Sequence, residues 1–246
     1  MKRILIVGGA GGIGLSMAAV LDQRAETEKI YIVDKAPLPS PNPLTSKTEA
    51  FSFDLTSSDY SFFDRFDDID TLIITAGFGR LALFQDVPEE MIQTYFAVNT
   101  IPAMRLVKRF YNRLLGNTPF RLGVMVSIAG YMSSPFFALY GATKAALRIF
   151  IESVNVELEK AGSTNRVLNV SPGSIRGTGF SGGATDLDTT RPLAEDILQH
   201  LADGDDLFIP QYDEVFRQVL QRAHDDFRAE GLHSYDYKLQ RLHPSK

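Results

Sequence analysis

Tyr140 and Lys144 are the two side chains whose types and spacing point most directly to chemistry. They lie four residues apart in a segment of helical period, so they would share one helix face with Cβ atoms about 5–6 Å apart. A free phenol titrates near pKa 10, and an ammonium about 4 Å away is worth about 4 kcal/mol at an effective dielectric of about 20. We therefore expect Lys144 to lower the pKa of Tyr140 toward about 7, where a phenol can exchange protons with a substrate.

Ser127 and Asn99 are candidate partners of this pair. Ser127 closes a predicted strand, at the edge where open parallel sheets place their ligands, and its hydroxyl could hold a substrate carbonyl oxygen. A serine at a strand end is also an ordinary turn residue. Asn99 falls inside a helical stretch, where most asparagines are exposed, although an inward one could hold a water against Lys144.

A glycine-rich turn follows the first predicted strand and opens the first predicted helix. Gly8 permits a tight turn, Gly12 would let the backbone approach a pyrophosphate, and Gly14 would let the helix pack closely on the strand. The helix that starts at Ile13 would offer free N–H groups to a phosphate. A glycine turn without a ligand is the alternative. A mononucleotide P-loop is disfavoured because Leu15, and not lysine, follows the last glycine.

Asp34 ends the second predicted strand, roughly 20 residues beyond the glycines. An acidic side chain at this place can accept hydrogen bonds from the ribose hydroxyls of NAD and would repel the 2′-phosphate of NADP. The adjacent Lys35 could partly accommodate that phosphate, so NADP stays open as the less favoured cofactor. A plain turn residue at a strand end is the other interpretation of Asp34.

Apolar β-rich runs alternate with longer segments of helical period, which is typical of parallel strands joined by crossover helices. The predicted strands are residues 3–7, 30–33, 50–53, 71–75, 122–127, 167–170 and 207–209. The predicted helices are residues 13–24, 88–115 and 136–160, followed by a helical apolar stripe through 216–227. We expect an α/β fold: a doubly wound, Rossmann-type parallel sheet of about seven strands with helices on both faces.

Two segments are predicted to be irregular. Residues 36–47 carry four prolines and favour a surface loop. Residues 178–191 are rich in Gly, Thr and Asp and could form a lid over a site or an ordinary loop. We expect one domain over residues 1–246, with a substrate-loop region at 178–230 and a polar tail at 231–246.

In this order and these contexts, the motifs resemble the short-chain dehydrogenase/reductase family in its compact single-domain subtype. The resemblance covers roughly residues 3–180. The matching residues are Gly8, Gly12, Ile13 and Gly14 of the glycine turn, Asp34, Asp54, Leu55, Ala76, Gly77, Asn99, Ser127, Tyr140, Lys144, Pro172 and Gly173. Thr75 departs from the asparagine that usually precedes Ala-Gly in the family, and the stretch 172–178 is one residue longer than the commonest version.

The resemblance also implies roles. Asn99, Ser127, Tyr140 and Lys144 would be the catalytic residues, and the remaining matches would bind the cofactor. Asp54 and Leu55 are expected near adenine, Ala76 and Gly77 near the cofactor ribose, and Ile175 and Thr178 near the nicotinamide carboxamide. Assembly as a homodimer or homotetramer is implied as well.

The expected function is hydride transfer between NAD and a small carbonyl or alcohol substrate, with Tyr140 as general acid or base. Two alternatives stay open: a non-catalytic NAD-binding redox sensor, and an enzyme like the sugar-nucleotide epimerases. Retention of all four catalytic residues argues against a sensor. Sugar-nucleotide epimerases are longer proteins with a sizeable C-terminal substrate domain, which argues against the second alternative. Candidate walls of an apolar substrate pocket, each of which could instead be core, are Phe78, Tyr131, Met132, Phe136, Phe137 and Phe180.

Composition excludes several other classes. With a net charge of −5 and scattered basic residues, the sequence shows no basic cluster that could bind nucleic acid or an anionic membrane surface. The absence of cysteine excludes disulfides, thiolate zinc sites and iron–sulfur clusters, and we expect no metal. No segment approaches the roughly 20 apolar residues of a membrane span. We therefore expect a cytoplasmic protein.

Overall fold

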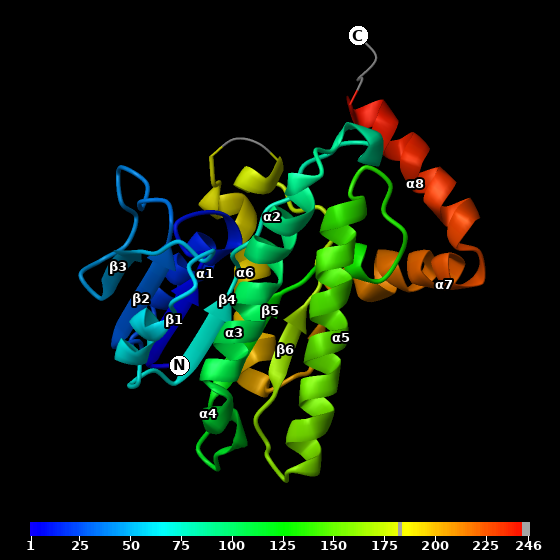
Figure 1. The fold of residues 1–246 in the computed structure, drawn as a ribbon. Helices are drawn as coiled ribbons and strands as arrows, with labels where there is room; N and C mark the ends of the chain where they lie inside the picture. Colours follow the sequence, from blue (N-terminus) through cyan, green and yellow to red (C-terminus); the bar gives the residue numbers. More distant parts are fainter. Residues whose placement is uncertain (182–183, 243–246) are drawn as a thin grey trace.

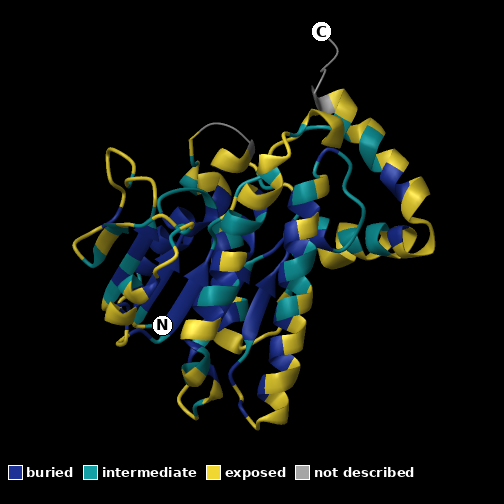
Figure 2. Cartoon of the chain, in the orientation of Figure 1, coloured by how far each residue is buried: buried dark blue, intermediate teal, exposed yellow. Residues whose placement is uncertain are grey.

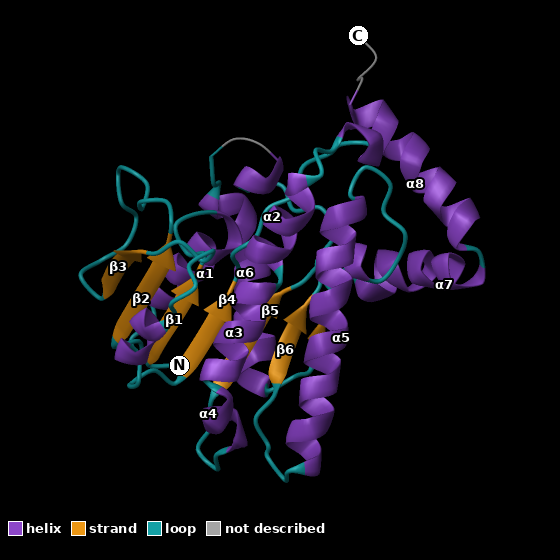
Figure 3. Ribbon diagram, in the orientation of Figure 1, coloured by secondary structure: helices purple, strands orange, loops and turns teal. Residues whose placement is uncertain are grey.

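Seven parallel strands form one sheet in the computed structural model, which describes residues 1–181 and 184–242. The strand order is β3-β2-β1-β4-β5-β6-β7 (Figures 1 and 3). The strand bounds are β1 Arg3–Val7, β2 Lys29–Asp34, β3 Thr48–Ser52, β4 Thr71–Ile74, β5 Arg121–Met125, β6 Val167–Val170 and β7 Leu207–Phe208. The predicted fold class and all seven predicted strands are confirmed, with strand ends displaced by at most two residues.

The sheet is buried on both faces because helices cover each of them. Along β1, Ile4 and Ile6 point into a core shared with α1 (Gly12–Asp22) and α6 (Leu187–Asp203). Leu5 and Val7 point into the opposite core, which contains residues of α3 (Ile101–Arg109) and α5 (Ala138–Lys160). This alternation follows from the two-residue period of a strand. Figure 2 shows the central strands as the most buried layer of the molecule.

The topology creates a crevice at one edge of the sheet. From β1 the chain runs outward through β2 and β3, and then returns to place β4 on the other side of β1. The loops that follow β1 and β4 therefore diverge to opposite faces at the carboxyl ends of these strands. Such a switch point is where open α/β sheets bind their ligands.

The predicted helix over residues 88–115 is wrong as a single element. The chain forms α2 (Glu90–Asn99), α3 (Ile101–Arg109) and α4 (Tyr111–Leu115). Thr100, with φ −122° and ψ −59°, leaves the helical region, and Pro102 in the first turn of α3 has no N–H to continue the ladder. A second break falls at Phe110, where φ is −94° and ψ is 8°.

Helix α6 is one of the elements that the sequence analysis missed. The irregular segment predicted over residues 178–191 ends at Asp186, because its carboxylate caps α6 by accepting hydrogen bonds from the N–H groups of Asp188 and Thr189. Gly204 ends the helix in the left-handed conformation. The other predicted irregular segment, residues 36–47, does form a loop.

The C-terminal part of the chain is more helical than predicted. Residues 178–230 contain α6, β7 and α7 (Arg217–Asp225), and the expected polar tail forms α8 (Phe227–Leu242), which leans away from the sheet in Figure 1. The stripe through 216–227 breaks at Asp226, whose backbone is extended. Residues 243–246 of the predicted tail lie outside the described part of the chain. Among the described residues, no helix has the length and apolar character needed to cross a membrane.

Candidate active site

The glycine turn is locked against the neighbouring strand by close backbone contacts. Gly8 has φ +93°, and a Cβ on it would lie 2.4 Å from the amide nitrogen of Ala76. A Cβ on Gly14 would lie 2.4 Å from the Gly8 carbonyl oxygen. Thr75 donates a hydrogen bond to that same oxygen (2.8 Å), so its hydroxyl joins the ends of β1 and β4. Thr75, which stands where the family resembled usually has asparagine, therefore has a structural role at the ends of these two strands.

The N-terminus of α1 is suited to an anion. Its N-cap is Gly11, which has no side chain to satisfy the first amides, and the space beside Gly12 is open except for Thr178, 3.8 Å from a Cβ placed there. The Gly12 N–H donates to the Thr185 hydroxyl (2.7 Å). These residues fit the pyrophosphate of a dinucleotide, provided that Thr185 gives up this donor when the phosphate binds.

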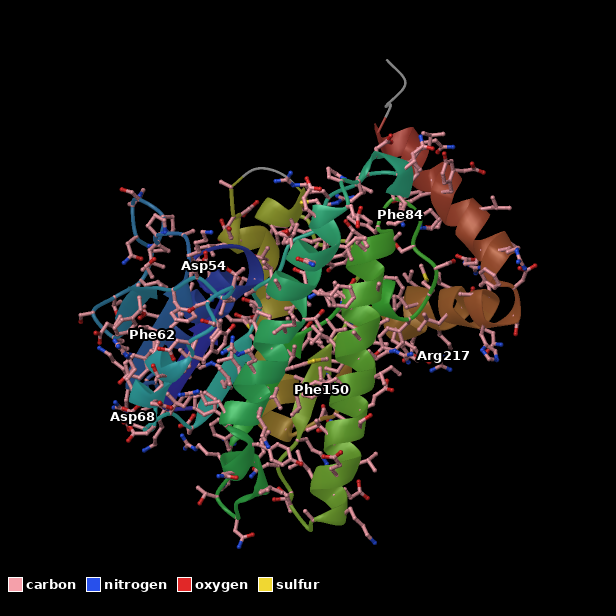
Figure 4. All side chains as sticks on the ribbon, in the orientation of Figure 1. Asp54, Phe62, Asp68, Phe84, Phe150 and Arg217 are labelled. Carbon is pink, nitrogen blue, oxygen red and sulfur yellow. The ribbon has the colours of Figure 1, made fainter. Side chains whose placement is uncertain are left out.

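Asp34 lies beside the glycine turn, as the sequence analysis expects. Its carboxylate accepts hydrogen bonds from the backbone N–H groups of Ala10 and Ala36, both at 3.0 Å. Lys35 does not join it: its ammonium pairs with Asp54 at 2.9 Å, and this hydrogen bond is the main reason that the pKa of Asp54 falls to about 2. Figure 4 labels Asp54 at the same edge of the sheet, beyond β2. The Leu55 carbonyl next to it accepts a hydrogen bond from the Tyr60 hydroxyl (2.7 Å).

Ser127 and Tyr140 meet at the end of β5. Ser127 caps the short 3₁₀ turn Ile128–Gly130, because its hydroxyl oxygen accepts the Ala129 N–H (3.2 Å). The same hydroxyl lies 3.4 Å from the Pro172 carbonyl oxygen, and its interaction with the phenol of Tyr140 acts to lower the pKa of that phenol. Tyr140 projects from the first turn of α5, so the helix start brings the two hydroxyls together.

Lys144 lies beneath Tyr140 on the same helix face. The ammonium is 5.6 Å from the centre of the tyrosine ring and donates to the Met125 carbonyl oxygen at the end of β5 (2.8 Å). Lys144 is only 2% exposed. The ammonium is therefore held by the sheet, and not by the phenol oxygen.

The predicted lowering of the Tyr140 pKa is wrong for this structure. Burial raises the pKa of Tyr140 to about 12, and the hydrogen bond with Ser127 opposes this rise only in part. Burial also lowers the pKa of Lys144 to about 8. The sequence argument considered the attraction between ammonium and phenolate and left out the desolvation of both groups, which the structure shows to dominate.

Asn99 faces inward and joins three parts of the site. Its side-chain oxygen accepts the Phe78 N–H (2.9 Å), and its amide donates to the Phe78 carbonyl (2.8 Å) and the Thr143 hydroxyl (3.3 Å). A Cβ on Gly77 would lie 3.3 Å from the Asn99 oxygen and 3.5 Å from the Lys144 nitrogen. Asn99, Lys144 and the Ala76-Gly77 segment therefore converge behind Tyr140. Through these hydrogen bonds Asn99 holds the loop after β4 in place.

The segment after β6 returns to the same crevice. Pro172 accepts hydrogen bonds from Ile128 and Ser127, and the ring of Phe216 packs closely over Gly173, where a Cβ would lie 2.5 Å from it. Ile175 packs against the α1 and α6 core, and Thr178, whose hydroxyl donates to the Ile175 carbonyl (3.3 Å), reaches the glycine turn. Of the sequence-predicted cofactor residues on this segment, Thr178 is the one that lies against the glycine turn, 3.8 Å from a Cβ placed on Gly12.

An aromatic cover over Tyr140 comes partly from the predicted pocket walls. The Phe180 ring centre lies 5.2 Å from that of Tyr140, and the Phe137 ring centre lies 5.5 Å from it. Phe136 and Phe137 line a small pocket beside Tyr140, and the ring of Phe78 lies tilted against that of Tyr95, which also lines it. Tyr131 is not a wall, since its hydroxyl turns toward β6 and accepts a hydrogen bond from Asn169 (2.8 Å). Met132 is half-buried in the following turn.

Three residues of the site had no signal in the sequence. Arg80 and Tyr95 line the pocket beside Tyr140, and Thr185 holds the Gly12 amide. Their positions depend on how the loop after β4 and the segment before α6 fold back on the sheet edge. No local pattern of residues marks them.

The fold and the glycine turn define a doubly wound α/β protein of the dinucleotide-binding class. A family model described as short chain dehydrogenase matches residues 2–186. The chain therefore belongs to the short-chain dehydrogenase/reductase family, and it is an oxidoreductase of that family.

Similar proteins agree with this assignment. An uncharacterized oxidoreductase of Staphylococcus epidermidis is 24% identical over 183 residues, covering 71% of this chain and 78% of the relative. Retinol dehydrogenase 8 of Bos taurus is 26% identical over 236 residues, covering 91% and 75%. A crystal structure of a short chain dehydrogenase from Burkholderia cenocepacia in complex with NADP has the same fold, with a TM-score of 0.77, 21% identity and coverage of 95% and 99%.

Proposed function

We propose that this chain transfers hydride between NAD and a carbonyl or alcohol substrate, with Tyr140 as the general acid or base. The observation that carries the proposal is the placement of the Tyr140 phenol beside Ser127 at the carboxyl edge of the sheet, with the buried ammonium of Lys144 5.6 Å from the centre of the tyrosine ring. A redox sensor would have no use for such a pair.

The roles of the side chains follow from their contacts. In reduction, the Ser127 and Tyr140 hydroxyls donate hydrogen bonds to the substrate oxygen, and Tyr140 gives up its proton as the alcohol forms. Lys144 supplies positive charge beneath the ring, which stabilises the phenolate that this step leaves behind. When bound, the nicotinamide supplies or accepts the hydride, and its oxidised form adds positive charge that favours the phenolate. Oxidation of an alcohol uses the same groups in reverse.

Asp34 supports a preference for NAD over NADP. Its carboxylate is fixed by two backbone amides, and the nearest cation, Lys35, is paired with Asp54. A 2′-phosphate near Asp34 would meet a fixed negative charge, and the adjacent Lys35 is already paired with Asp54. Fluorescence titration with NADH and NADPH tests this preference, and tighter binding of NADPH would overturn it. Because the similar dehydrogenase from Burkholderia cenocepacia was crystallised in complex with NADP, this titration should be performed first.

The activity is tested by following NADH absorbance with a panel of aldehydes, ketones and alcohols. The panel includes retinal because one relative is a retinol dehydrogenase. Consumption of NADH that depends on a carbonyl compound supports the proposal. Tight NADH binding with no turnover of any compound would favour a redox sensor.

We also propose assembly as a homodimer or homotetramer through α5. Ile149 and Val156, seven residues apart on this helix, are 52% and 70% exposed and form an apolar stripe. Light scattering tests the assembly, and a monomer at micromolar concentration would refute it.

A further inference from the structure

The segment 133–137, which leads into Tyr140, contains a strained residue. Phe136 has φ +65°, a left-handed value that bulky side chains rarely adopt and that persists only where the surroundings enforce it. Phe137 follows it as the N-cap of α5, and its carbonyl oxygen accepts the Gly141 N–H (2.7 Å). The conformation of this segment therefore sets where α5 begins and how Tyr140 projects from its first turn.

Helix α8 packs along this segment. The Ser133 hydroxyl donates to the Phe227 carbonyl oxygen at the start of α8 (3.0 Å), and the ring centres of Phe136 and Tyr235 are 4.8 Å apart. A Cβ on Gly231 would lie 2.8 Å from the Ser133 hydroxyl oxygen, so the helix backbone comes close to the segment. Figure 1 shows the segment on the green loop between the start of α5 and α8.

Lys238 makes the charged contact between α8 and the segment 133–137. Its ammonium donates to the Ser134 hydroxyl (2.8 Å) and the Pro135 carbonyl oxygen (2.9 Å), and it lies 5.4 Å from the centre of the Phe137 ring. These contacts fall on both sides of the strained residue. Among the residues that the structure describes, no carboxylate forms an ion pair with Lys238. Burial lowers the pKa of its ammonium to about 8, so the chain keeps this charge against a desolvation cost.

Phe137 connects the segment to Tyr140. The two ring centres are 5.5 Å apart, so the contacts from Lys238 to the phenol-bearing residue are continuous. A loose segment would let the Tyr140 phenol move away from Ser127. Misplacing reacting groups by about 1 Å can slow a reaction about 100-fold, so this hold bears directly on the rate.

We propose that Lys238 is a positioning residue for Tyr140, because it fixes the segment 133–137 and thereby the direction in which the phenol leaves α5. The inference rests on the proposed function and adds a residue of α8 to the same site. In this role Lys238 acts through the segment and does not contact the reacting atoms. Its loss should therefore lower kcat and leave NADH binding unchanged.

Kinetics of single variants are the first test, with the carbonyl compound of the panel above that the wild type reduces most efficiently. Lys238→Met should lower kcat by about 10-fold or more, with an unchanged Kd for NADH. Lys238→Arg should recover most of the lost rate, because a guanidinium can donate to the same two oxygens. Tyr235→Leu, which removes the ring that packs on Phe136, should also lower kcat. Arg228→Met removes an exposed cation from the same helix and should keep the wild-type kcat.

A double-variant cycle separates positioning from a general loosening of the enzyme. If Lys238 acts through the Tyr140 phenol, adding Lys238→Met to Tyr140→Phe should change the residual kcat by no more than about 2-fold, because the phenol is already absent. A merely structural role would lower kcat by the same factor in both backgrounds.

Amide hydrogen exchange followed by mass spectrometry measures the hold on the segment without turnover. In Lys238→Met, the amides of residues 133–141 should exchange about 10-fold faster than in the wild type, because two hydrogen bonds to the segment are lost. The amides of β1 should keep their wild-type rate, which shows that the variant is folded. Wild-type exchange over 133–141 in a folded Lys238→Met protein would overturn the proposal.

The failure of this proposal and the failure of the proposed function are distinguishable. If no carbonyl compound is reduced, the proposed function fails and the positioning role fails with it. If a compound is reduced but Lys238→Met keeps the wild-type kcat, or lowers it equally with and without the Tyr140 phenol, hydride transfer stands and the role of Lys238 is overturned.

Discussion

Lys144→Met is expected to make the protein more stable at neutral pH while it removes most of the activity. Lys144 is 2% exposed, and no carboxylate pairs with it within residues 1–181 and 184–242. Burial alone lowers the pKa of its ammonium from 10.5 to about 8. The folded protein therefore carries a buried charge that the unfolded chain would leave in water.

The size of the effect follows from this pKa difference. At about 1.4 kcal/mol per pKa unit, a fall from 10.5 to about 8 lowers the free energy of unfolding by about 3 kcal/mol at pH 7, where Lys144 is charged in both states. Methionine relieves this cost but loses the hydrogen bond to Met125, which is worth about 1 kcal/mol. The net gain is about 2 kcal/mol.

The pH dependence identifies the cause. The cost of burying the charge is fully present below pH 8, and it is lost as the pH rises to 10.5, because the folded protein releases this proton before the unfolded chain does. The advantage of Lys144→Met over the wild type should therefore shrink by about 2 kcal/mol between pH 7 and pH 10. Stability gained at the expense of an active-site charge is a known trade-off.

Urea unfolding followed by far-UV circular dichroism measures these free energies, because the chain has no tryptophan for fluorescence. Lys160→Met, which removes an exposed ammonium from the last turn of the same helix, is the matched control and should change stability little at either pH. A Lys144→Met protein that is less stable than the wild type at pH 7, or a difference that stays constant up to pH 10, would refute the reasoning.

Three further predictions concern the cofactor side of the site. Gly14→Ala should lower the free energy of unfolding by about 2 kcal/mol or more in urea, because its Cβ would meet a backbone oxygen at 2.4 Å, whereas Gly179→Ala, with open space around it, should change little. Carbonyl reduction should decline above about pH 8, as Lys144 loses its proton, and a rate that is flat to pH 10 would contradict this. Thr185→Val frees the Gly12 amide, so the Kd for NADH should fall about 3-fold to 10-fold in fluorescence titration, while an unchanged Kd would mean that Thr185 does not compete.

The strands and the glycine turn were predictable because their signals are local. Each central strand is a short apolar run buried on both faces, and Gly8 and Gly14 are fixed by backbone contacts that no other residue permits. The proximity of Tyr140 and Lys144 was also predictable, since it depends only on the period of a helix.

The features that could not be predicted from the sequence depend on contacts between distant segments. The pKa of Tyr140 is raised by burial, and Phe180, which packs on its ring, comes from the segment after β6. The start of α6 was missed because Asp186 resembles the loop residues before it until its capping hydrogen bonds are seen. Tyr95 lies beside Tyr140 because the loop after β4 folds back on the sheet edge, and no local pattern of residues marks this.

The central claim is that the phenol of Tyr140 transfers the proton that accompanies hydride transfer. Tyr140→Phe removes only that hydroxyl, and Tyr111→Phe removes one from α4, where the partner is Glu157, as a control. The decisive measurement is kcat for carbonyl reduction, followed by NADH absorbance, together with the Kd for NADH. The account predicts that Tyr140→Phe binds NADH like the wild type and that its kcat is lower by about 100-fold or more, while Tyr111→Phe keeps both values. A Tyr140→Phe enzyme with nearly wild-type kcat would contradict the account.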